Sequence, residues 1–486
     1  MKKTVLYVLL ALSMMSGPAF AEPSIKVSGS EVTVKESVTD AYVSQMKSAQ
    51  RLVLVDISDA DLAKACSACP DVTKIEIKSK NLTSIEPVAG LTKLQNLKLE
   101  AEKVKDMSPL AKLTGLQYLY IISRAMGPDL KWMTGMTSLK DVSISAGPAL
   151  TSFEGLPKVP TLSRIKISSA SPADLSPLQS LPGLKDVDLT GCVIADLTPL
   201  TKLPALQYVN LYGATVKDFS PLAACPKLKK VMYYSTKDAD YSTLGKLTQV
   251  TELKGGLTKL DSIAWVTSLP NLKIFDVFAE YVTDYSPLAK TNVEEFQIWN
   301  MRVPVGDLGV VGQAKSLKKL KLWSVEGATN SKGLSGLVNL EKFTITGDYN
   351  KKGGEAFDFA AASGWSKLKE LEVNEAALVN MDGLDKCTAL KTIKFSKLRG
   401  DPVSLAFLGK MTNLTKLELN QSKVKDFDAV AGCTALTTVV LTKVEGVTSL
   451  AALKKLPGLK TVVVSKGAFP DSELAGFAAG TKITQR

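Results

Sequence analysis

The side chains that most often perform chemistry in proteins are few in this sequence. It has no histidine among 486 residues, which excludes a Ser-His-Asp triad, a Cys-His pair and histidine metal sites. Its carboxylates show no spacing that pairs two of them, and Gly353-Gly354 is typical of a turn rather than of a phosphate-binding loop. We therefore predict that the chain is not an enzyme and holds no cofactor and no metal.

Cysteines are the remaining reactive groups. Cys66 and Cys69, two of the six, have the spacing of a redox pair or of a small disulfide. Cys69, like Cys225, Cys387 and Cys433, also lies three residues before a predicted strand. Other copies of the repeat described below carry leucine at this position. Cys387 and Cys433 are two repeats apart, roughly 10 Å on the strand spacing, which is beyond disulfide reach. The sequence predicts small buried side chains here and leaves a disulfide between Cys66 and Cys69 open.

Large aromatic side chains recur with a second regular spacing. Although only 6% of the chain is aromatic, a series interrupted by one glycine repeats at intervals of 21 to 24 residues: Tyr212, Tyr234, Gly256, Phe278, Trp299 and Trp323. We call the five aromatic members the aromatic stripe. Tyr208 and Met232 accompany it, and Asp276 and Lys321 are polar neighbours in the same segments. Earlier in the chain, Tyr118 and Tyr120 alternate with Leu119 and Ile121.

A repeat of about the same length organises most of the chain. The segment LTPLTKLPALQYVNL at 197–211 is followed by a second copy, FSPLAACPKLKKVMY at 219–233. The first apolar residue of each L-x-x-L-x-L unit falls at Val72, Leu94, Leu116, Leu139, Leu162, Leu184, Leu206, Leu228, Val250, Leu272, Val293, Leu317, Leu340, Leu368, Leu390, Leu414, Leu436 and Leu459. These 18 units are 21 to 24 residues apart, except for one interval of 28. This period and leucine spacing indicate a leucine-rich repeat solenoid.

The repeat predicts how each unit is arranged. Positions 1, 4 and 6, such as Leu206, Val209 and Leu211, should point into the core, and alternation along a strand places positions 3, 5 and 7 on the opposite face. Recurring Ser/Thr-Pro-Leu segments suit tight turns. The predicted fold is an α/β-type repeat solenoid. It is a curved horseshoe with a parallel β-sheet on the concave face and short turns or 3-10 segments on the convex face.

Four segments are predicted along the chain. Residues 1–21 have a basic start, a short apolar run and Ala19-Phe20-Ala21, which is typical of a cleavable signal peptide. Residues 22–71 should form an N-terminal cap, with a hairpin around Gly29, a helix at 38–49, a strand at 52–57 and a helix at 59–68. Residues 72–466 are the repeats, including an insertion at 349–364. Residues 467–486 should form a C-terminal cap with a helix to about 479 and a strand at 482–484.

Three segments, VKDMSPL at 104–110, VKDFSPL at 216–222 and VTDYSPL at 282–288, resemble the 22-residue repeat of bacterial internalin-type proteins. The resemblance covers most of residues 72–466 and implies the solenoid fold. The asparagine that the family places after the strand is missing, since Cys192, Ala214 and Thr236 stand there. The immunoglobulin-like and wall-anchoring modules of internalins have no room in the sequence.

The sequence predicts an exported protein, periplasmic or secreted, that recognises other molecules. The net charge of +12 comes from scattered lysines without a run of five like charges, which favours a solvated surface over nucleic-acid binding. No later segment is apolar enough for an integral membrane span after signal cleavage. The aromatic stripe, with Tyr208, Met232, Asp276 and Lys321, is the predicted binding site for a host-surface or envelope protein. Glycan binding and an envelope scaffold without a discrete ligand are the alternatives.

Overall fold

The computed structural model describes residues 24–237, 239–257, 260–299, 303, 305–325, 327–346 and 356–486. The predicted signal peptide, and the part of the predicted insertion at 349–355, lie outside the described residues. The chain divides into two compact units, Met1–Ala195 with Lys202–Ala205, and Asp196–Thr201 with Leu206–Arg486. We call these unit 1 and unit 2 and describe each by itself.

Unit 1 is built on a sheet of nine strands. They are β1 (Ser24–Ser28), β2 (Glu31–Lys35), β3 (Arg51–Val55), β4 (Lys74–Lys78), β5 (Asn96–Glu100), β6 (Tyr118–Ile122), β7 (Asp141–Ser145), β8 (Arg164–Ser168) and β9 (Asp186–Asp188). Strand β1 pairs antiparallel with β2, and each later strand pairs in parallel with the one before it. The unit also contains α2 (Asp40–Met46) and α3 (Asp59–Ala68).

Unit 2 continues the same strand pattern. Its parallel sheet consists of β10 (Tyr208–Asn210), β11 (Lys230–Tyr233), β12 (Glu252–Leu257), β13 (Ile274–Ala279), β14 (Glu295–Trp299), β16 (Lys319–Trp323), β18 (Lys342–Thr346), β20 (Glu370–Asn374), β22 (Thr392–Ser396), β24 (Lys416–Asn420), β26 (Thr438–Thr442), β27 (Thr461–Val464) and β28 (Lys482–Gln485). Three small two-stranded ladders join β15 (Gly306–Asp307) to β17 (Ala328–Thr329), β19 (Phe357–Asp358) to β21 (Leu378–Val379), and β23 (Val403–Ser404) to β25 (Val424–Lys425).

Each of the 18 predicted repeats contributes one strand, so the predicted register is confirmed. In β5, for example, Leu97 and Leu99 are buried, whereas Asn96, Lys98 and Glu100 are only partly covered. Neighbouring strands match residue for residue, because the repeats have nearly equal length. Leucines of successive repeats therefore stack into one continuous core, and burial of their apolar surface is the main stabilising contribution.

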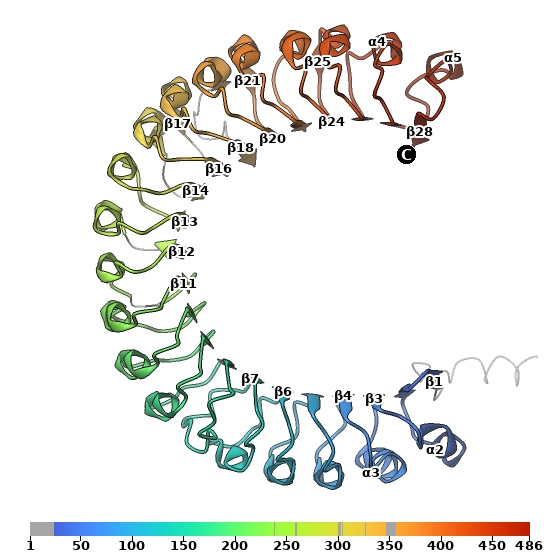
Figure 1. Cartoon of the computed structure of the whole chain (residues 1–486), viewed down its shortest axis with the longest axis vertical. Helices are drawn as coiled ribbons and strands as arrows, with labels where there is room; N and C mark the ends of the chain where they lie inside the picture. The colour runs from blue at the N-terminus through green and yellow to red at the C-terminus, as the bar shows by residue number, and fades with distance from the viewer. Residues whose placement is uncertain are drawn as a thin grey trace, which may run out of the picture. The chain divides into compact units, whose positions relative to one another are not determined.

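Short 3-10 segments occupy the other side of most repeats. In unit 1 they span Glu86–Gly90, Ser108–Lys112, Lys131–Met133 and Ser176–Ser180. In unit 2 they span Ser220–Ala224, Tyr241–Lys246, Ala264–Ser268, Ser286–Lys290, Leu308–Gln313, Ser331–Gly336, Phe359–Gly364, Met381–Lys386, Ala406–Lys410 and Phe427–Gly432. One more, Thr198–Lys202, spans the boundary between the units in the sequence. Within each unit the strands line the inner side of the curve and these segments the outer side (Figure 1), as the repeat predicted.

An aspartate begins many of these segments. The Asp106 carboxylate accepts hydrogen bonds from the backbone N–H of Ser108 at 2.8 Å and from its hydroxyl at 2.9 Å. Asp218 accepts the same pair from Ser220. Proline is tolerated at the first position of such a turn because its missing N–H would have had no helical partner. The hydrogen bonds from Ser108 lower the pKa of Asp106, so this capping carboxylate stays charged into the acidic range.

The segments at the two ends of the chain extend the sheet. The hairpin around Gly29, the strand β3 and the helix α3 occur as predicted, and Ser58 with Asp61 forms a capping box at the start of α3. Strands β2 and β3 lie in the same parallel ladder as β4. The predicted helix at 470–479 is shortened to α5 (Asp471–Leu474), because the backbone is already extended at Ala475, with ψ 164°, and Gly476 follows in the left-handed region with φ +78°. Another short helix, α4 (Ala451–Lys454), precedes β27.

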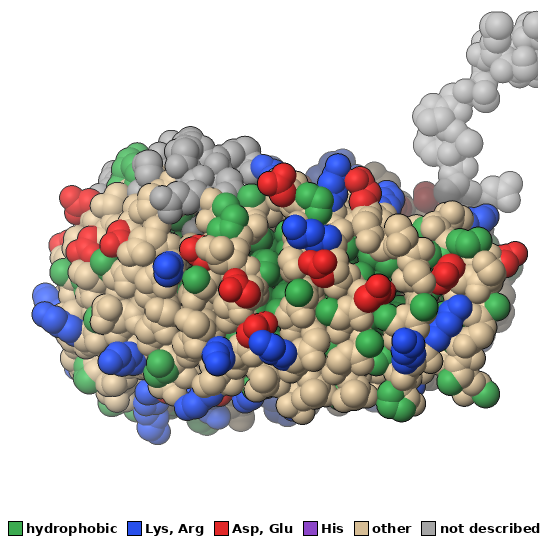
Figure 2. Space-filling model, turned by 90° about the horizontal axis from the view of Figure 1, so that it is seen from above, with side chains coloured by type: hydrophobic (Ala, Val, Ile, Leu, Met, Phe, Trp, Pro, Cys, Tyr) green, Lys and Arg blue, Asp and Glu red, His purple; other side chains and the backbone are tan. Residues whose placement is uncertain are grey.

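Two surface properties bear on function. Over the ranges given above, the chain forms no helix with the length and apolarity that crossing a bilayer requires. Figure 2 shows lysine, arginine and carboxylate side chains interspersed over the visible face of the molecule. Ion pairs between neighbouring strands, such as Lys319 with Glu295 and Lys342 with Glu370 at 2.6 Å, neutralise many of the lysines. A mixed surface of this kind favours solubility.

Candidate functional site

The aromatic stripe lies on the side of the unit 2 sheet that faces away from the core. Phe278, Trp299 and Trp323 occupy matching positions in three neighbouring strands. The rings of Trp299 and Trp323 are stacked, with centroids 4.5 Å apart and planes inclined by 7°. Phe278 contacts Trp299 edge-on at 5.1 Å. The ring separation is close to the spacing between β-strands, so the repeat itself places these rings in contact.

The stripe is divided into two groups. Tyr212 and Tyr234 form the first, with ring centroids 6.4 Å apart. Gly256 occupies the next position and supplies no ring, and a Cβ there would lie 3.5 Å from Phe278. Tyr212 is 49% exposed, whereas Tyr234, Phe278, Trp299 and Trp323 are half-buried. The rings therefore cover one another in part.

The predicted companions of the stripe are close to it. The Lys321 Nζ lies 4.1 Å from the centroid of the Trp323 ring, a cation–π contact. The Tyr208 hydroxyl donates a hydrogen bond to the Met232 Sδ at 3.8 Å, and the Lys230 Nζ lies 5.3 Å from the Tyr208 ring. These contacts hold cations against ring faces on the side of the sheet that faces away from the core.

Asp276 lies between the two aromatic groups and is partly desolvated. Burial raises the pKa of Asp276, and hydrogen bonding from Tyr234 and the charges of Lys254 and Lys321 offset this only in part. Burial also raises the pKa of Tyr234, and the charge of Asp276 adds to that shift. The Asp276 Oδ1 and the Trp299 Nε1 are buried without a hydrogen-bond partner among the described residues.

Cys66 and Cys69 are free thiols in the structure, so the disulfide that their spacing left open is not present in it. Cys66 lies in α3, and the Cys69 Sγ donates a hydrogen bond to the Met46 carbonyl at 3.0 Å. All six cysteines are buried. Burial raises the pKa of Cys66 to about 12, with a further contribution from Cys69, and raises the pKa of Cys69 to about 11.

We expect the native protein to resist thiol reagents near pH 8, about the ordinary pKa of a thiol. The raised pKa values leave almost no thiolate, and burial excludes the reagent. Titration with Ellman's reagent, without reductant, should detect all six thiols only after unfolding. Fast modification of the native chain would contradict this, and recovery of only four thiols after unfolding would show one disulfide, which peptide mapping would assign to Cys66 and Cys69 or to another pair.

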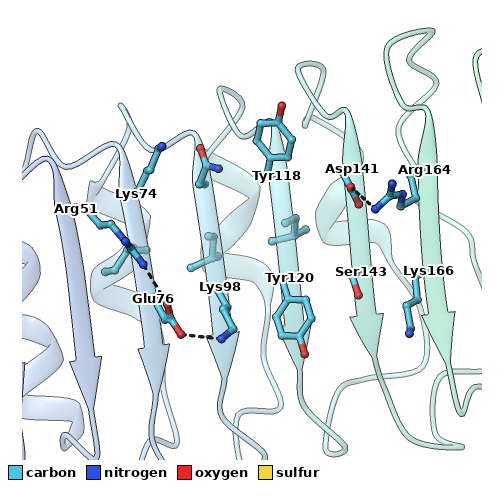
Figure 3. A pocket seen from close by; sticks show the side chains of 14 residues that line it. Arg51, Lys74, Glu76, Lys98, Tyr118, Tyr120, Asp141, Ser143, Arg164 and Lys166 are labelled. Carbon is cyan, nitrogen blue, oxygen red and sulfur yellow. Dashed lines mark hydrogen bonds and ion pairs between the residues drawn. The ribbon is translucent and has the colours of Figure 1, made fainter. Parts of the chain in front are cut away.

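The structure also contains a groove in unit 1, and the residues that line it were not among the predicted site residues. It crosses the side of strands β3 to β8 that faces away from the core, and its volume is about 610 Å³. Tyr118 and Tyr120 lie at its centre on β6, and their hydroxyls point toward opposite ends of the strand (Figure 3). They are 45% and 36% exposed, respectively.

Ion pairs flank both sides of this groove. Glu76 pairs with Arg51 at 3.7 Å and with Lys98 at 2.7 Å. Arg164 pairs with Asp141 at 3.5 Å on the other side (Figure 3). Burial raises the pKa of Asp141, and the charge of Arg164 works against that shift. In the sequence, this groove is indicated only by the alternation of Tyr118 and Tyr120 with the buried Leu119 and Ile121. This alternation occurs in a single repeat, so no aromatic residue recurs at the same position in the neighbouring repeats.

Within the ranges that the structure describes, no group of three or more cysteine, aspartate or glutamate side chains could hold a metal ion. The arrangement in both units is a set of exposed or half-buried rings among ion-paired side chains. Such an arrangement can bind a molecule through apolar and charged contacts.

No protein-family model matches the chain, and no curated protein matches its sequence significantly. Among solved structures, an internalin (InlF) from Listeria monocytogenes is 21% identical, with 78% of this chain and 88% of that chain covered and a TM-score of 0.40. A leucine-rich repeat protein from Leptospira interrogans is 16% identical, with 88% and 99% covered and a TM-score of 0.46. Toll, from a Drosophila Toll–Spätzle complex, is 13% identical, with 92% and 66% covered and a TM-score of 0.57. The repeat register, the parallel sheets and this likeness of fold identify the chain as a leucine-rich repeat solenoid.

Proposed function

We propose that this chain is an exported recognition protein that binds a protein partner through the aromatic stripe of unit 2. The observation that carries the proposal is the stacked pair of Trp299 and Trp323 on the side of the sheet that faces away from the core. Tryptophan and tyrosine are enriched among the residues that dominate binding energy at protein interfaces. The likeness to Toll is one of fold, so the proposal depends on the stripe and not on that neighbour.

The contacts within the stripe favour a protein over a glycan. Sugar rings stack on open aromatic faces, but Trp299 and Trp323 face each other at 4.5 Å. Phe278 and Lys321 contact the same two rings. What remains accessible is a rigid, ridged surface of ring edges with polar groups beside it, which suits a partner of complementary shape.

Export supports a partner outside the cytoplasm. The basic start, the apolar run at 5–12 and the Ala19-Phe20-Ala21 site are typical of a cleavable signal peptide. An envelope protein or a host-surface protein is therefore the expected partner, and the mature chain is expected in the periplasm or the medium.

The test compares two double variants. The chain from Glu22 onward would be immobilised and exposed to envelope and host-surface extracts, and each retained protein would then be purified and titrated. Trp299→Ala/Trp323→Ala should weaken binding by about 30-fold or more, the equivalent of about 2 kcal/mol for a dominant interface residue. Trp132→Ala/Trp265→Ala is the matched control, because these two half-buried tryptophans lie on 3-10 segments of the outer side.

Circular dichroism would first establish that both variants are folded. Equal affinity of the wild type and the Trp299→Ala/Trp323→Ala variant would refute the stripe as the binding site. An equal loss in both double variants would point to a general defect and would also count against the proposal.

A further inference from the structure

The groove around Tyr118 and Tyr120 in unit 1 differs from the aromatic stripe in one respect. Rings of the stripe contact one another, whereas neither Tyr118 nor Tyr120 has an aromatic neighbour among the described residues. The Lys98 Nζ lies 5.7 Å from the centroid of the Tyr120 ring. Two large, partly exposed rings on adjacent outward positions of one strand form an apolar surface that a partner could bury.

The groove is lined by more cationic side chains than carboxylates, and they differ in whether they already make ion pairs. Five cationic residues line it, but only two carboxylates, Glu76 and Asp141, do so. Both carboxylates are already occupied by Arg51, Lys98 and Arg164, and these three cations also pair with Glu31, Glu100 and Asp186 beside the groove. Lys74 makes no ion pair with any described residue, and Lys166 reaches only Asp188, at 3.6 Å. Lys74 and Lys166 are therefore the lining cations most available to a ligand, and both lining carboxylates are already ion-paired.

We propose that this groove binds an acidic stretch of polypeptide. Its side chains would cover the rings of Tyr118 and Tyr120, and its carboxylates would pair with Lys74 on one side and Lys166 on the other. This is a second binding surface, with a partner chemistry that the aromatic stripe does not specify. A neutral glycan fits less well, because sugar hydroxyls are usually bound by carboxylates and amides, and the carboxylates here are already paired.

The probe is a fluorescein-labelled random copolymer of glutamate and tyrosine, followed by fluorescence anisotropy with the full mature chain. We expect binding that weakens as salt is added, because part of the attraction is between charges. Tyr118→Ala/Tyr120→Ala should reduce affinity about tenfold or more, as truncation of central interface aromatics does. Lys74→Glu should reduce affinity several-fold and flatten the salt dependence.

Matched controls separate this groove from general effects. Tyr281→Ala removes a tyrosine of similar exposure, 44%, and Lys112→Glu reverses an exposed charge in a 3-10 segment of unit 1. Both should bind like the wild type. These exposed substitutions remove little buried surface, so the variants should remain folded.

Three results would overturn the proposal. The first is no binding of the glutamate copolymer, or equal binding of a lysine–tyrosine copolymer. The second is binding that Tyr118→Ala/Tyr120→Ala leaves unchanged. The third is binding of hyaluronan, an anionic polysaccharide, without binding of the glutamate copolymer, which would assign the groove to an acidic glycan instead.

Discussion

Replacing Gly255 by alanine should lower the free energy of unfolding by about 3 kcal/mol, because the added methyl group would collide with a buried ring. A Cβ on Gly255 would lie 2.2 Å from the Tyr233 Cδ2. Tyr233 is fully buried, and its ring packs against Phe219 and Tyr241, at 5.9 Å from each. The ring cannot move aside without displacing these neighbours. Urea unfolding followed by circular dichroism would measure the change.

The adjacent glycine provides a matched control for this effect. Gly256 lies in the same strand, but a Cβ there would meet its nearest atom at 3.5 Å, an ordinary contact. Gly256→Ala should therefore leave stability unchanged or raise it by a few tenths of a kcal/mol. Adding Tyr233→Leu to Gly255→Ala should recover part of the lost stability. If both glycine variants behaved alike, backbone entropy rather than the ring would be responsible.

Truncation of Trp365 should cost about 3–5 kcal/mol, the range for a fully buried tryptophan replaced by alanine. Trp365 follows the insertion in the longest repeat and is 0% exposed. Its ring centroid lies 4.7 Å from that of Phe343, and its Nε1–H donates a hydrogen bond to the Leu334 carbonyl at 2.9 Å. Since repeats contact mainly their neighbours, the damage should be local. Hydrogen exchange should show lost protection in β18 and β20.

Two further variants test the origin of this loss. Trp365→Phe keeps most of the apolar volume and removes one hydrogen bond from the Leu334 carbonyl, which still accepts the backbone N–H of Leu337 at 3.1 Å, so it should cost only about 1 kcal/mol. Tyr281→Ala, on an exposed ring, should cost little. A uniform loss of exchange protection that included β4 to β7 of unit 1 would contradict the local picture.

Much of the fold could be predicted from the repeat, since one period determines both the strands and their inward positions. Leu206, Val209 and Leu211 are buried as predicted. The pairing of Tyr233 with Gly255 could not be predicted in this way. The period assigns both residues to inward positions, but the direction in which a tyrosine ring leans toward the next repeat depends on its rotamer and neighbours. The shortened α5 was likewise missed, because only the backbone shows that the chain becomes extended at Ala475.

For the candidate site, the sequence predicted which side chains lie next to one another, but not how far their rings are exposed to solvent. The period placed Phe278, Trp299 and Trp323 side by side, and the strand pairing confirms this neighbourhood. It did not show that rings about 5 Å apart shield one another. Tyr118 and Tyr120 are more exposed than most of the stripe because the matching positions of the adjoining strands β5 and β7 carry no ring. A long column of aromatic residues was therefore a weaker indicator of open surface than an isolated pair.

The antiparallel pairing of β1 with β2 bears on polymerisation. A parallel ladder can in principle continue from one molecule into the next, and such head-to-tail contacts generate open fibres rather than closed oligomers. Strand β28 pairs in parallel with β27 and lies at one edge of the sheet. If a second copy stacked on this edge in the same orientation, its strand β1 would lie next to β28 and run in the opposite direction. Strand β1 is also largely exposed and offers little apolar surface on which another core could stack. Reversal of β1 therefore removes the parallel continuation of the ladder, and its small apolar surface leaves little for a copy to bury if it paired with β1 in the antiparallel sense.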